Sequence, residues 1–220
     1  MKLLVLATVV VLAGIAASSA AATNECRGLQ VCVPVAGPWV VATPGRTEFQ
    51  LSCPKNFIVA GLDAELSARG IDVGFVGSLG SPVNPGITTS RDAVFLGRLV
   101  RGSSASTFRP HIGCVPASGG GRRVPTVHHA FPPGKPTMRH VLQVRVNGGT
   151  ATRSLRCARN ERLVSASHAV GFFGDSPPGA AFVRQVRASH RVRDGVATVT
   201  VRSAEGVAAV VQLDIVCVPK

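Results

Sequence analysis

Apolar and polar residues alternate along most of the chain, which is the pattern of strands with one buried face. The alternation is clearest in segments 47–53, 142–146, 196–202 and 207–217. In the last segment the residues predicted to point inward are Val207, Ala209, Val211, Leu213, Ile215 and Cys217. The second segment ends at Asn147-Gly148-Gly149, which predicts a turn. The fold class predicted is all-β, with antiparallel sandwich-like modules.

Two other segments complete the expected elements. Phe57–Leu62 is nearly all apolar, which predicts a strand covered on both sides. Asp63–Arg69 is the one segment in which we expect a turn or two of helix. Glycine and proline are dense within 117–139, which predicts a boundary between a module at 23–116 and a second at 117–220.

The N-terminus has the pattern of a cleaved signal peptide. Lys2 precedes an apolar run from Leu3 to Ala17, and small residues follow at 18–22. Fifteen apolar positions are fewer than the roughly 20 that cross a bilayer. We therefore expect residues 1–22 to be removed, with cleavage after Ala20 or Ala22, no remaining transmembrane span, and a secreted or extracytoplasmic protein.

Export makes disulfides the expected state of the six cysteines. Cys-Val-Pro occurs at 32–34, 114–116 and 217–219, and Leu-x-Cys-x-x-Asn begins at 51 and at 155. Two segments of nearly equal length therefore open and close with the same motifs, which indicates a tandem duplication. The duplication favours Cys26–Cys32, Cys53–Cys114 and Cys157–Cys217. The alternative pairs Cys32 with Cys53 and Cys114 with Cys157, which leaves Cys26 for Cys217.

The first of the two repeated segments, from Cys53 to Cys114, resembles a known kind of module. Cys53-Pro54, followed by Ile58-Val59-Ala60-Gly61-Leu62 and a closing cysteine, is similar to Cys-Pro-x-x-x-x-Val-x-Gly-Gly modules of exported bacterial proteins, especially actinobacterial ones. The resemblance covers mainly 53–114 and more weakly 157–217. It implies an adhesive or envelope-associated β domain and carries over no catalytic residue.

Charge separates the two halves of the chain. The net charge is +13, of which one positive charge lies in the signal segment. Residues 23–116 hold eight basic and six acidic side chains, whereas residues 117–220 hold fifteen basic and five acidic ones. The arginines that we consider candidates for binding an anion are Arg153, Arg156, Arg159, Arg162, Arg187, Arg191 and Arg193. On a strand through 183–193, the last three would share one face, and Arg184 and His190 would lie on the other.

The excess of basic residues in the second half has two interpretations. It is an electrostatic surface for an anionic envelope polymer, a lipid headgroup or a protein partner, or it reflects the codon usage of a GC-rich genome. Nucleic acid is a poorer partner, because the chain is exported and has only nine Phe and one Trp for stacking on bases.

Catalytic motifs are missing from the sequence. It has no Gly-x-Ser-x-Gly, His-Glu-x-x-His, phosphate-binding loop or dinucleotide fingerprint. We predict a non-enzymatic binding protein with no cofactor and no metal. His111, His128, His129 and His140 are the histidines that could serve as zinc ligands, but the sequence does not favour a zinc site. The alternatives are an envelope hydrolase, for which Asp63, Glu65, His111 and the pair His128/His129 are the available acids, bases or ligands, and a purely structural envelope component.

Overall fold

The computed structural model describes residues 23–29, 31–77, 91–102, 104–117 and 137–220. The expected signal peptide, most of the expected boundary and the pair His128/His129 lie outside these residues. The strands are β1 (Val33–Ala36), β2 (Trp39–Val41), β3 (Arg46–Ser52), β4 (Phe57–Leu66), β5 (Ile71–Gly77), β6 (Asp92–Leu99), β7 (Thr107–Pro116), β8 (Met138–Arg156), β9 (Glu161–Phe172), β10 (Val186–Arg193) and β11 (Val196–Pro219). One four-residue helix, α1 (Ala180–Val183), is the sole α-helix of this part of the chain. The all-β prediction is confirmed.

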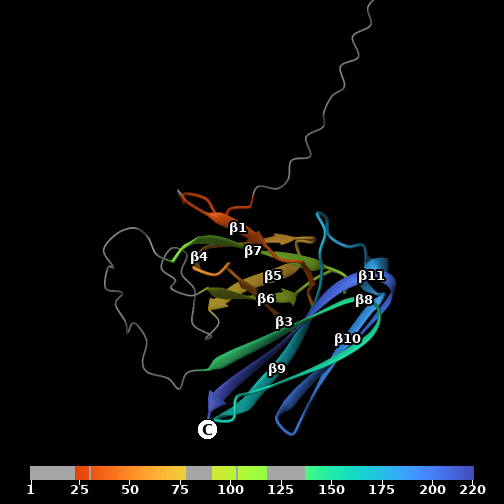
Figure 1. Ribbon diagram of the computed structural model, residues 1–220. Coiled ribbons are helices and arrows are strands. Elements are labelled where there is room, and N and C mark those ends of the chain that lie inside the picture. The colour runs from red at the N-terminus through yellow and green to blue at the C-terminus, as the bar shows by residue number, and fades with distance from the viewer. Residues whose placement is uncertain (1–22, 30, 78–90, 103, 118–136) are drawn as a thin grey trace, which may run out of the picture.

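The strands form two antiparallel sheets (Figure 1). The larger has eight strands in the order β1-β7-β2-β9-β11-β10, with β4 also paired to β7 and β8 to β11. The smaller has the order β3-β6-β5. Phe49 and Phe95 of the small sheet and Phe108 and Ile112 of the large sheet are buried in one apolar core, which holds the two sheets together.

β11 changes partner along its 24 residues. Its first part, Val196–Ser203, pairs with β10, and Val210–Pro219 pairs with β9, while β8 follows it on the other side. The register is irregular between Ser203 and Ala208. The sheet of the second half is folded so that both parts of β11 point into one apolar core, which includes Val199, Val201, Leu213 and Ile215.

Two local predictions are wrong. Asn147-Gly148-Gly149 does not end a strand: β8 continues to Arg156, and Gly148 and Gly149 have φ values of 91° and 77° at the irregular part of the β8–β11 pairing. The segment from Asp63 is not helical, because Asp63–Leu66 extends β4 opposite 108–111 of β7. In both places pairing with a distant strand decided the backbone.

All three disulfides expected from the duplication are present, namely Cys26–Cys32, Cys53–Cys114 and Cys157–Cys217. Three disulfides are typical of proteins that fold in an oxidising compartment. Among the described residues, no helix has the length and apolarity needed to cross a membrane.

The two segments closed by a long-range disulfide, 53–114 and 157–217, also share their local contacts. Val59, six residues after Cys53, lies opposite Cys114, and Leu163, six residues after Cys157, lies opposite Cys217. The carbonyl of Asn56 accepts a hydrogen bond from the amide of Ala117 at 2.8 Å, and that of Asn160 accepts one from Lys220 at 3.0 Å. Each acceptor precedes its strand by one residue, and each donor follows its closing cysteine by three. These matched contacts support a tandem duplication.

The halves are nevertheless joined in one sheet, since β2 pairs with both β7 and β9. The face of β11 opposite the predicted inward row is also buried: Val210, Gln212 and Asp214 are at most 1% exposed. The Gln212 amide makes two hydrogen bonds to the backbone of Gln50 on β3, at 2.6 and 3.0 Å. The side-chain amide of Gln212 thereby satisfies the backbone N–H and C=O of Gln50 at the edge of the small sheet, as a neighbouring strand would.

A buried ionic cluster lies at the same junction. Arg139 on β8 forms ion pairs with Glu48 on β3 at 2.6 Å and with Asp214 on β11. The three side chains are 9%, 10% and 1% exposed. Burial raises the pKa of Asp214 from 3.8 to about 6, although the neighbouring Arg139 favours the charged carboxylate.

This raised pKa predicts a pH dependence of stability. The folded state holds the Asp214 proton at a higher pH than the unfolded chain does, so the stabilisation is complete below about 3.8 and is lost as pH rises through about 6. Urea unfolding between pH 4 and pH 7 measures it. Relative to Asp214→Asn, the wild-type free energy of unfolding should fall by on the order of 1–3 kcal/mol over this range. Parallel pH profiles would contradict this.

Candidate anion-binding site

The outward face of β10, the first part of β11 and the end of β8 consists almost wholly of arginines and hydroxyl side chains. Residues directly opposite each other on paired strands point to the same side of a sheet. The register sets out four rows across the three strands: Arg187–Arg202–Thr150, Ser189–Thr200–Thr152, Arg191–Thr198–Ser154 and Arg193–Val196–Arg156. We call these twelve residues the arginine–hydroxyl face.

The opposite side of the same strands explains why this face points outward. Ala197, Val199 and Val201 of β11 are fully buried. Because side chains alternate along a strand, the residues between them point to solvent. Threonine and valine also favour the extended backbone, so β-branched residues occupy both sides of this strand.

The hydroxyls of the face pair across the strands. Thr152 and Thr200 are joined through their Oγ1 atoms at 3.3 Å, and Ser154 and Thr198 at 2.8 Å. Such cross-strand pairs hold the side chains in place without any charge. Arginine supplies fixed N–H donors and serine and threonine supply O–H donors, which together suit phosphate, sulfate or carboxylate oxygens.

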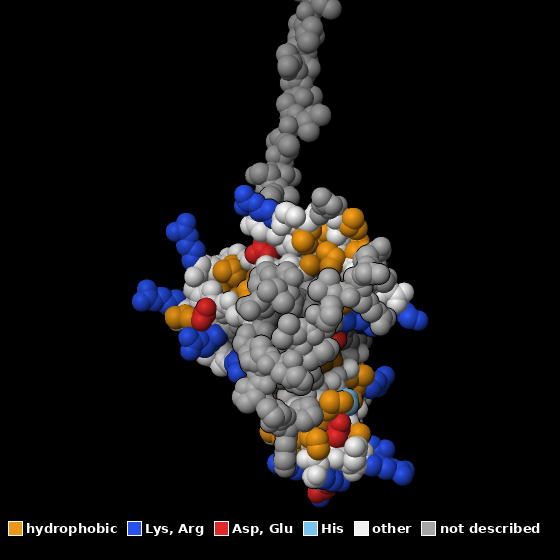
Figure 2. Space-filling model, turned by 90° about the vertical axis from the view of Figure 1, so that its left-hand side faces the viewer, with side chains coloured by type: hydrophobic (Ala, Val, Ile, Leu, Met, Phe, Trp, Pro, Cys, Tyr) orange, Lys and Arg blue, Asp and Glu red, His pale blue; other side chains and the backbone are white. Residues whose placement is uncertain are grey.

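The guanidinium groups of this face are largely free of carboxylate partners. Within the described chain, Arg156, Arg187, Arg191 and Arg202 form no ion pair. Arg193 contacts Asp194 at 3.4 Å, but both side chains are more than 85% exposed, so the pair is weak. The rows themselves contain no aspartate or glutamate. Figure 2 shows Lys and Arg side chains projecting at the edges of the molecule.

A groove of about 600 Å³ follows the face along β10. Its lining residues include Arg187, Arg191 and Arg202 together with Ser189, Thr152, Thr198 and Thr200. An extended ligand that follows this groove therefore meets cations and hydroxyls in alternation.

The predicted arginines divide into three groups. Arg156, Arg187, Arg191 and Arg193 lie on the arginine–hydroxyl face. Arg159 and Arg162 line a hollow with Lys220 beside Cys157, which Arg156 and Val196 at the end of the face also border and to which Glu161 and Asp194 contribute negative charge. Arg153 is on the opposite side of β8 by alternation, and its Nη1 donates to the carbonyl of Thr152 at 2.9 Å.

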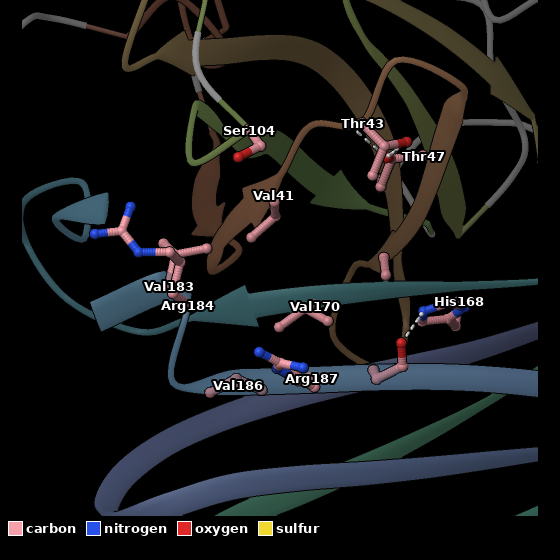
Figure 3. Close-up of a pocket in the computed structure, with 12 residues that line it drawn as sticks. Val41, Thr43, Thr47, Ser104, His168, Val170, Val183, Arg184, Val186 and Arg187 are labelled. Atoms are coloured by element: carbon pink, nitrogen blue, oxygen red, sulfur yellow. Dashed lines mark hydrogen bonds between the residues drawn. The ribbon is translucent and has the colours of Figure 1, made fainter. Parts of the chain in front are cut away.

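The strand predicted over 183–193 is shorter than expected. β10 begins at Val186, because α1 ends at Val183 and Arg184 forms its C-terminal cap (Figure 3). Arg184 therefore does not share a strand face with His190. Arg202 was not among the predicted arginines: its alternation with Val201 is visible in the sequence, but its place opposite Arg187 depends on the register.

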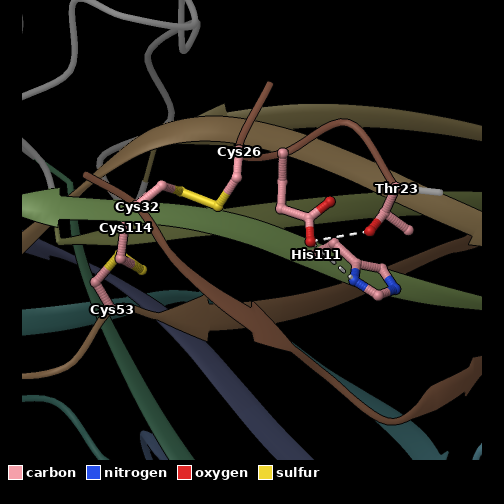
Figure 4. Close-up of a disulfide and its surroundings, with 7 residues drawn as sticks. Thr23, Cys26, Cys32, Cys53, His111 and Cys114 are labelled. Atoms are coloured by element: carbon pink, nitrogen blue, oxygen red, sulfur yellow. Dashed lines mark hydrogen bonds and ion pairs between the residues drawn. A yellow bond between two sulfur atoms is a disulfide. The ribbon is translucent and has the colours of Figure 1, made fainter. Parts of the chain in front are cut away.

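Among the described acids and bases of the hydrolase alternative, Asp63, Glu65 and His111 lie together on the outer side of β4 and β7, under the N-terminal segment (Figure 4). His111 is 8% exposed and lies 3.7 Å from Glu25 and 3.5 Å from Glu65. A Cβ atom at Gly61 or Gly113 would lie 1.7 or 2.1 Å from the carbonyl oxygen of Glu25. Glycine at both positions thus allows residues 23–29 to cover the cluster closely.

Asp63 also contacts the N-terminal segment. One of its carboxylate oxygens accepts a hydrogen bond from the amide of Asn24 at 2.7 Å and the other from that of Ala64 at 2.8 Å. Glu65 faces Arg109 at 3.8 Å. Asp63 thus fastens the N-terminal segment to the sheet, Glu65 is held by Arg109 and His111 of β7, and His111 is buried, which favours a structural role for the cluster.

His140 belongs to a third cluster. Its Nε2 is 3.0 Å from Glu161, and this hydrogen bond lowers the pKa of the Glu161 carboxyl. The sulfur of Cys217 completes a group of three metal-ligating residue types. That sulfur is bonded to Cys157, and a metal needs a thiolate, so the oxidised protein offers only two ligands here.

No family model, no curated protein and no solved structure matches this chain. Its function therefore has to be argued from the site. Among the clusters described above, the arginine–hydroxyl face gives the strongest indication of a function, because it brings together like-charged side chains that would repel one another without a partner.

Proposed function

We propose that the protein is an extracytoplasmic, non-enzymatic binding protein whose arginine–hydroxyl face binds a polyanion of the cell envelope. The observation that carries the proposal is the set of four rows in which five arginines and six hydroxyls point to solvent without a carboxylate among them. Holding like charges together on a surface has an electrostatic cost, which an anionic partner offsets.

The shape of the face favours a polymer over a lipid surface. β10 spans eight residues, or about 26 Å, and its outward side chains repeat roughly every 7 Å. Val196 is the one apolar residue of the rows, whereas proteins that lie on a membrane insert apolar and aromatic side chains beside their cations. A linear chain of phosphate, sulfate or carboxylate groups can contact Arg187, Ser189, Arg191 and Arg193 in turn.

Inorganic polyphosphate is a suitable probe, and titration calorimetry measures its affinity. We expect binding by the mature wild-type protein that weakens as salt is raised, because neutralising a polyanion releases its counterions. Replacing Arg187, Arg191 and Arg202 by serine should lower the affinity about 100-fold, since three exposed charge-assisted contacts contribute on the order of 3 kcal/mol together.

A matched control removes the same charge from the first half. Arg27, Lys55 and Arg101 are exposed, and within the described residues none of them forms an ion pair. Their triple replacement by serine should leave the affinity within about threefold of the wild type, the change expected from net charge alone. Equal losses in the two triple variants, or binding that does not depend on salt, would show that the face is no specific site.

A further inference from the structure

Another cavity lies between the two halves of the molecule, and it shares only Arg187 with the arginine–hydroxyl face. Its volume is about 510 Å³, within the range of small-molecule sites. Figure 3 shows residues of the first half on one side of it and residues of β9, α1 and β10 on the other. Its lining comprises Val41, Thr43, Thr47, Ser104, His168, Ala169, Val170, Val183, Arg184, Val186, Arg187 and Ala188.

The apolar part of the lining comes from four different elements. Val41 lies at the end of β2, Val170 on β9, Val183 at the end of α1 and Val186 at the start of β10. Val183 and Val186 are each 8% exposed and belong to the core of the second half. The cavity is thus an opening into that core, with room for a short aliphatic chain.

The polar part of the lining is cationic on one side and hydroxylic on the other. Arg184 and Arg187 stand on the side of α1 and β10, and Thr43, Thr47 and Ser104 stand opposite (Figure 3). Neither arginine forms an ion pair with another described residue. No aspartate or glutamate lines the cavity.

His168 closes the wall between β9 and β10. Its Nε2 donates to the carbonyl of Ala188 at 3.1 Å, so its Nδ1 is free to accept from Nδ1 of His190 at 2.7 Å. Burial lowers the pKa of His168, and the neighbouring His190 lowers it further. His168 is therefore a neutral wall residue near pH 7, and the positive charge at the cavity belongs to the two arginines.

We propose that this cavity binds a small amphipathic carboxylate, with its head group at Arg184 and Arg187 and its aliphatic chain against the four valines. The cavity combines what such a ligand needs, namely unpaired guanidinium groups at the rim, hydroxyl donors opposite and an apolar interior. Arg187 borders both this cavity and the polyanion groove, but Arg191, Arg202 and the threonines of β11 line only the groove, and Arg184 lines only the cavity.

Titration calorimetry with octanoate tests the proposal on the mature protein. We expect one octanoate per chain and an affinity about tenfold lower in Arg184→Ser, since one charge-assisted hydrogen bond is lost. Octanol and octylammonium, which share the chain but not the charge, should bind at least tenfold more weakly. Equal binding of the three probes, or an unchanged affinity in Arg184→Ser, would overturn the proposal.

A second variant and a cross-test separate this site from the polyanion face. Val170→Phe should fill the cavity and abolish octanoate binding, and a melting curve establishes whether the variant is folded. Arg184→Ser should leave polyphosphate binding unchanged, and Arg191→Ser should leave octanoate binding unchanged. If Arg191→Ser lowered octanoate affinity as strongly as Arg184→Ser, the carboxylate would be bound on the arginine–hydroxyl face and the cavity proposal would be wrong.

Discussion

Arg139→Met is expected to lower the free energy of unfolding by about 3–5 kcal/mol. Arg139 lies between Glu48 and Asp214 and is 9% exposed. Methionine fills a similar volume but cannot donate a hydrogen bond, so Asp214 would remain buried without a counter-charge, and Glu48 would keep only its ion pair with the exposed Arg46 at 2.8 Å. Urea unfolding at pH 7, followed by circular dichroism, measures the loss.

The matched control removes the carboxylate charges as well. In the Glu48→Gln/Asp214→Asn background, Arg139→Met should cost less than half as much, because no unpaired carboxylate is left behind. Equal costs in the two backgrounds would show that Arg139 contributes by packing and not by charge. The interpretation of this cluster as the ionic link between the halves would then be wrong.

The second large effect is expected at the disulfides. Replacing Cys157 and Cys217 by alanine should lower the free energy of unfolding by about 4 kcal/mol, because the bond closes a long loop in the unfolded chain. Its sequence separation is 60, against 6 for Cys26–Cys32. Removing the short ring should therefore cost only about 2 kcal/mol.

Chemical denaturation of the two double-alanine variants gives this comparison directly, with the wild type under the same conditions. A larger cost for removing the Cys26–Cys32 ring would contradict loop closure as the main source of stability. It would indicate instead that the contacts of residues 23–29 with β4 and β7 depend on the ring.

The sequence was sufficient for the strand class and for the disulfide pairing. Alternation identified the inward row of β11 from Val207 to Cys217, all of which the structure buries. The pairing followed from the repeated motifs around the cysteines, and the structure has the same pairs. Both features depend on spacing along the chain, which a single sequence displays.

Features that depend on contacts between distant strands could not be predicted. Gln212 and Asp214 lie on the side of β11 opposite the predicted inward row, and only the structure shows that they are buried there, with Gln212 bonded to the small sheet. The turn predicted at Asn147-Gly148-Gly149 is an irregularity inside a long pair of strands, which the same residues favour equally.

The candidate site was predicted in part. Arg187, Arg191 and Arg193 were correctly placed on one side of their strand, but their neighbours on β8 and β11 follow only from the register. The hydroxyl rows had no signature in the sequence, because serine and threonine are ordinary outward residues of a strand. The cavity between the halves has none either, since its lining comes from three segments of the chain, 41–47, Ser104 and 168–188, that are far apart in the sequence.

The central claim is that the arginine–hydroxyl face is the surface that contacts an anionic polymer. Amide chemical shifts of the mature protein, followed by NMR during titration with short-chain polyphosphate, test it most directly. The proposal predicts that the shifts change in 150–156, 187–193 and 196–202 and stay constant at Arg27, Lys55 and Arg101. Changes spread evenly over every exposed arginine, or centred on Arg159, Arg162 and Lys220, would contradict it.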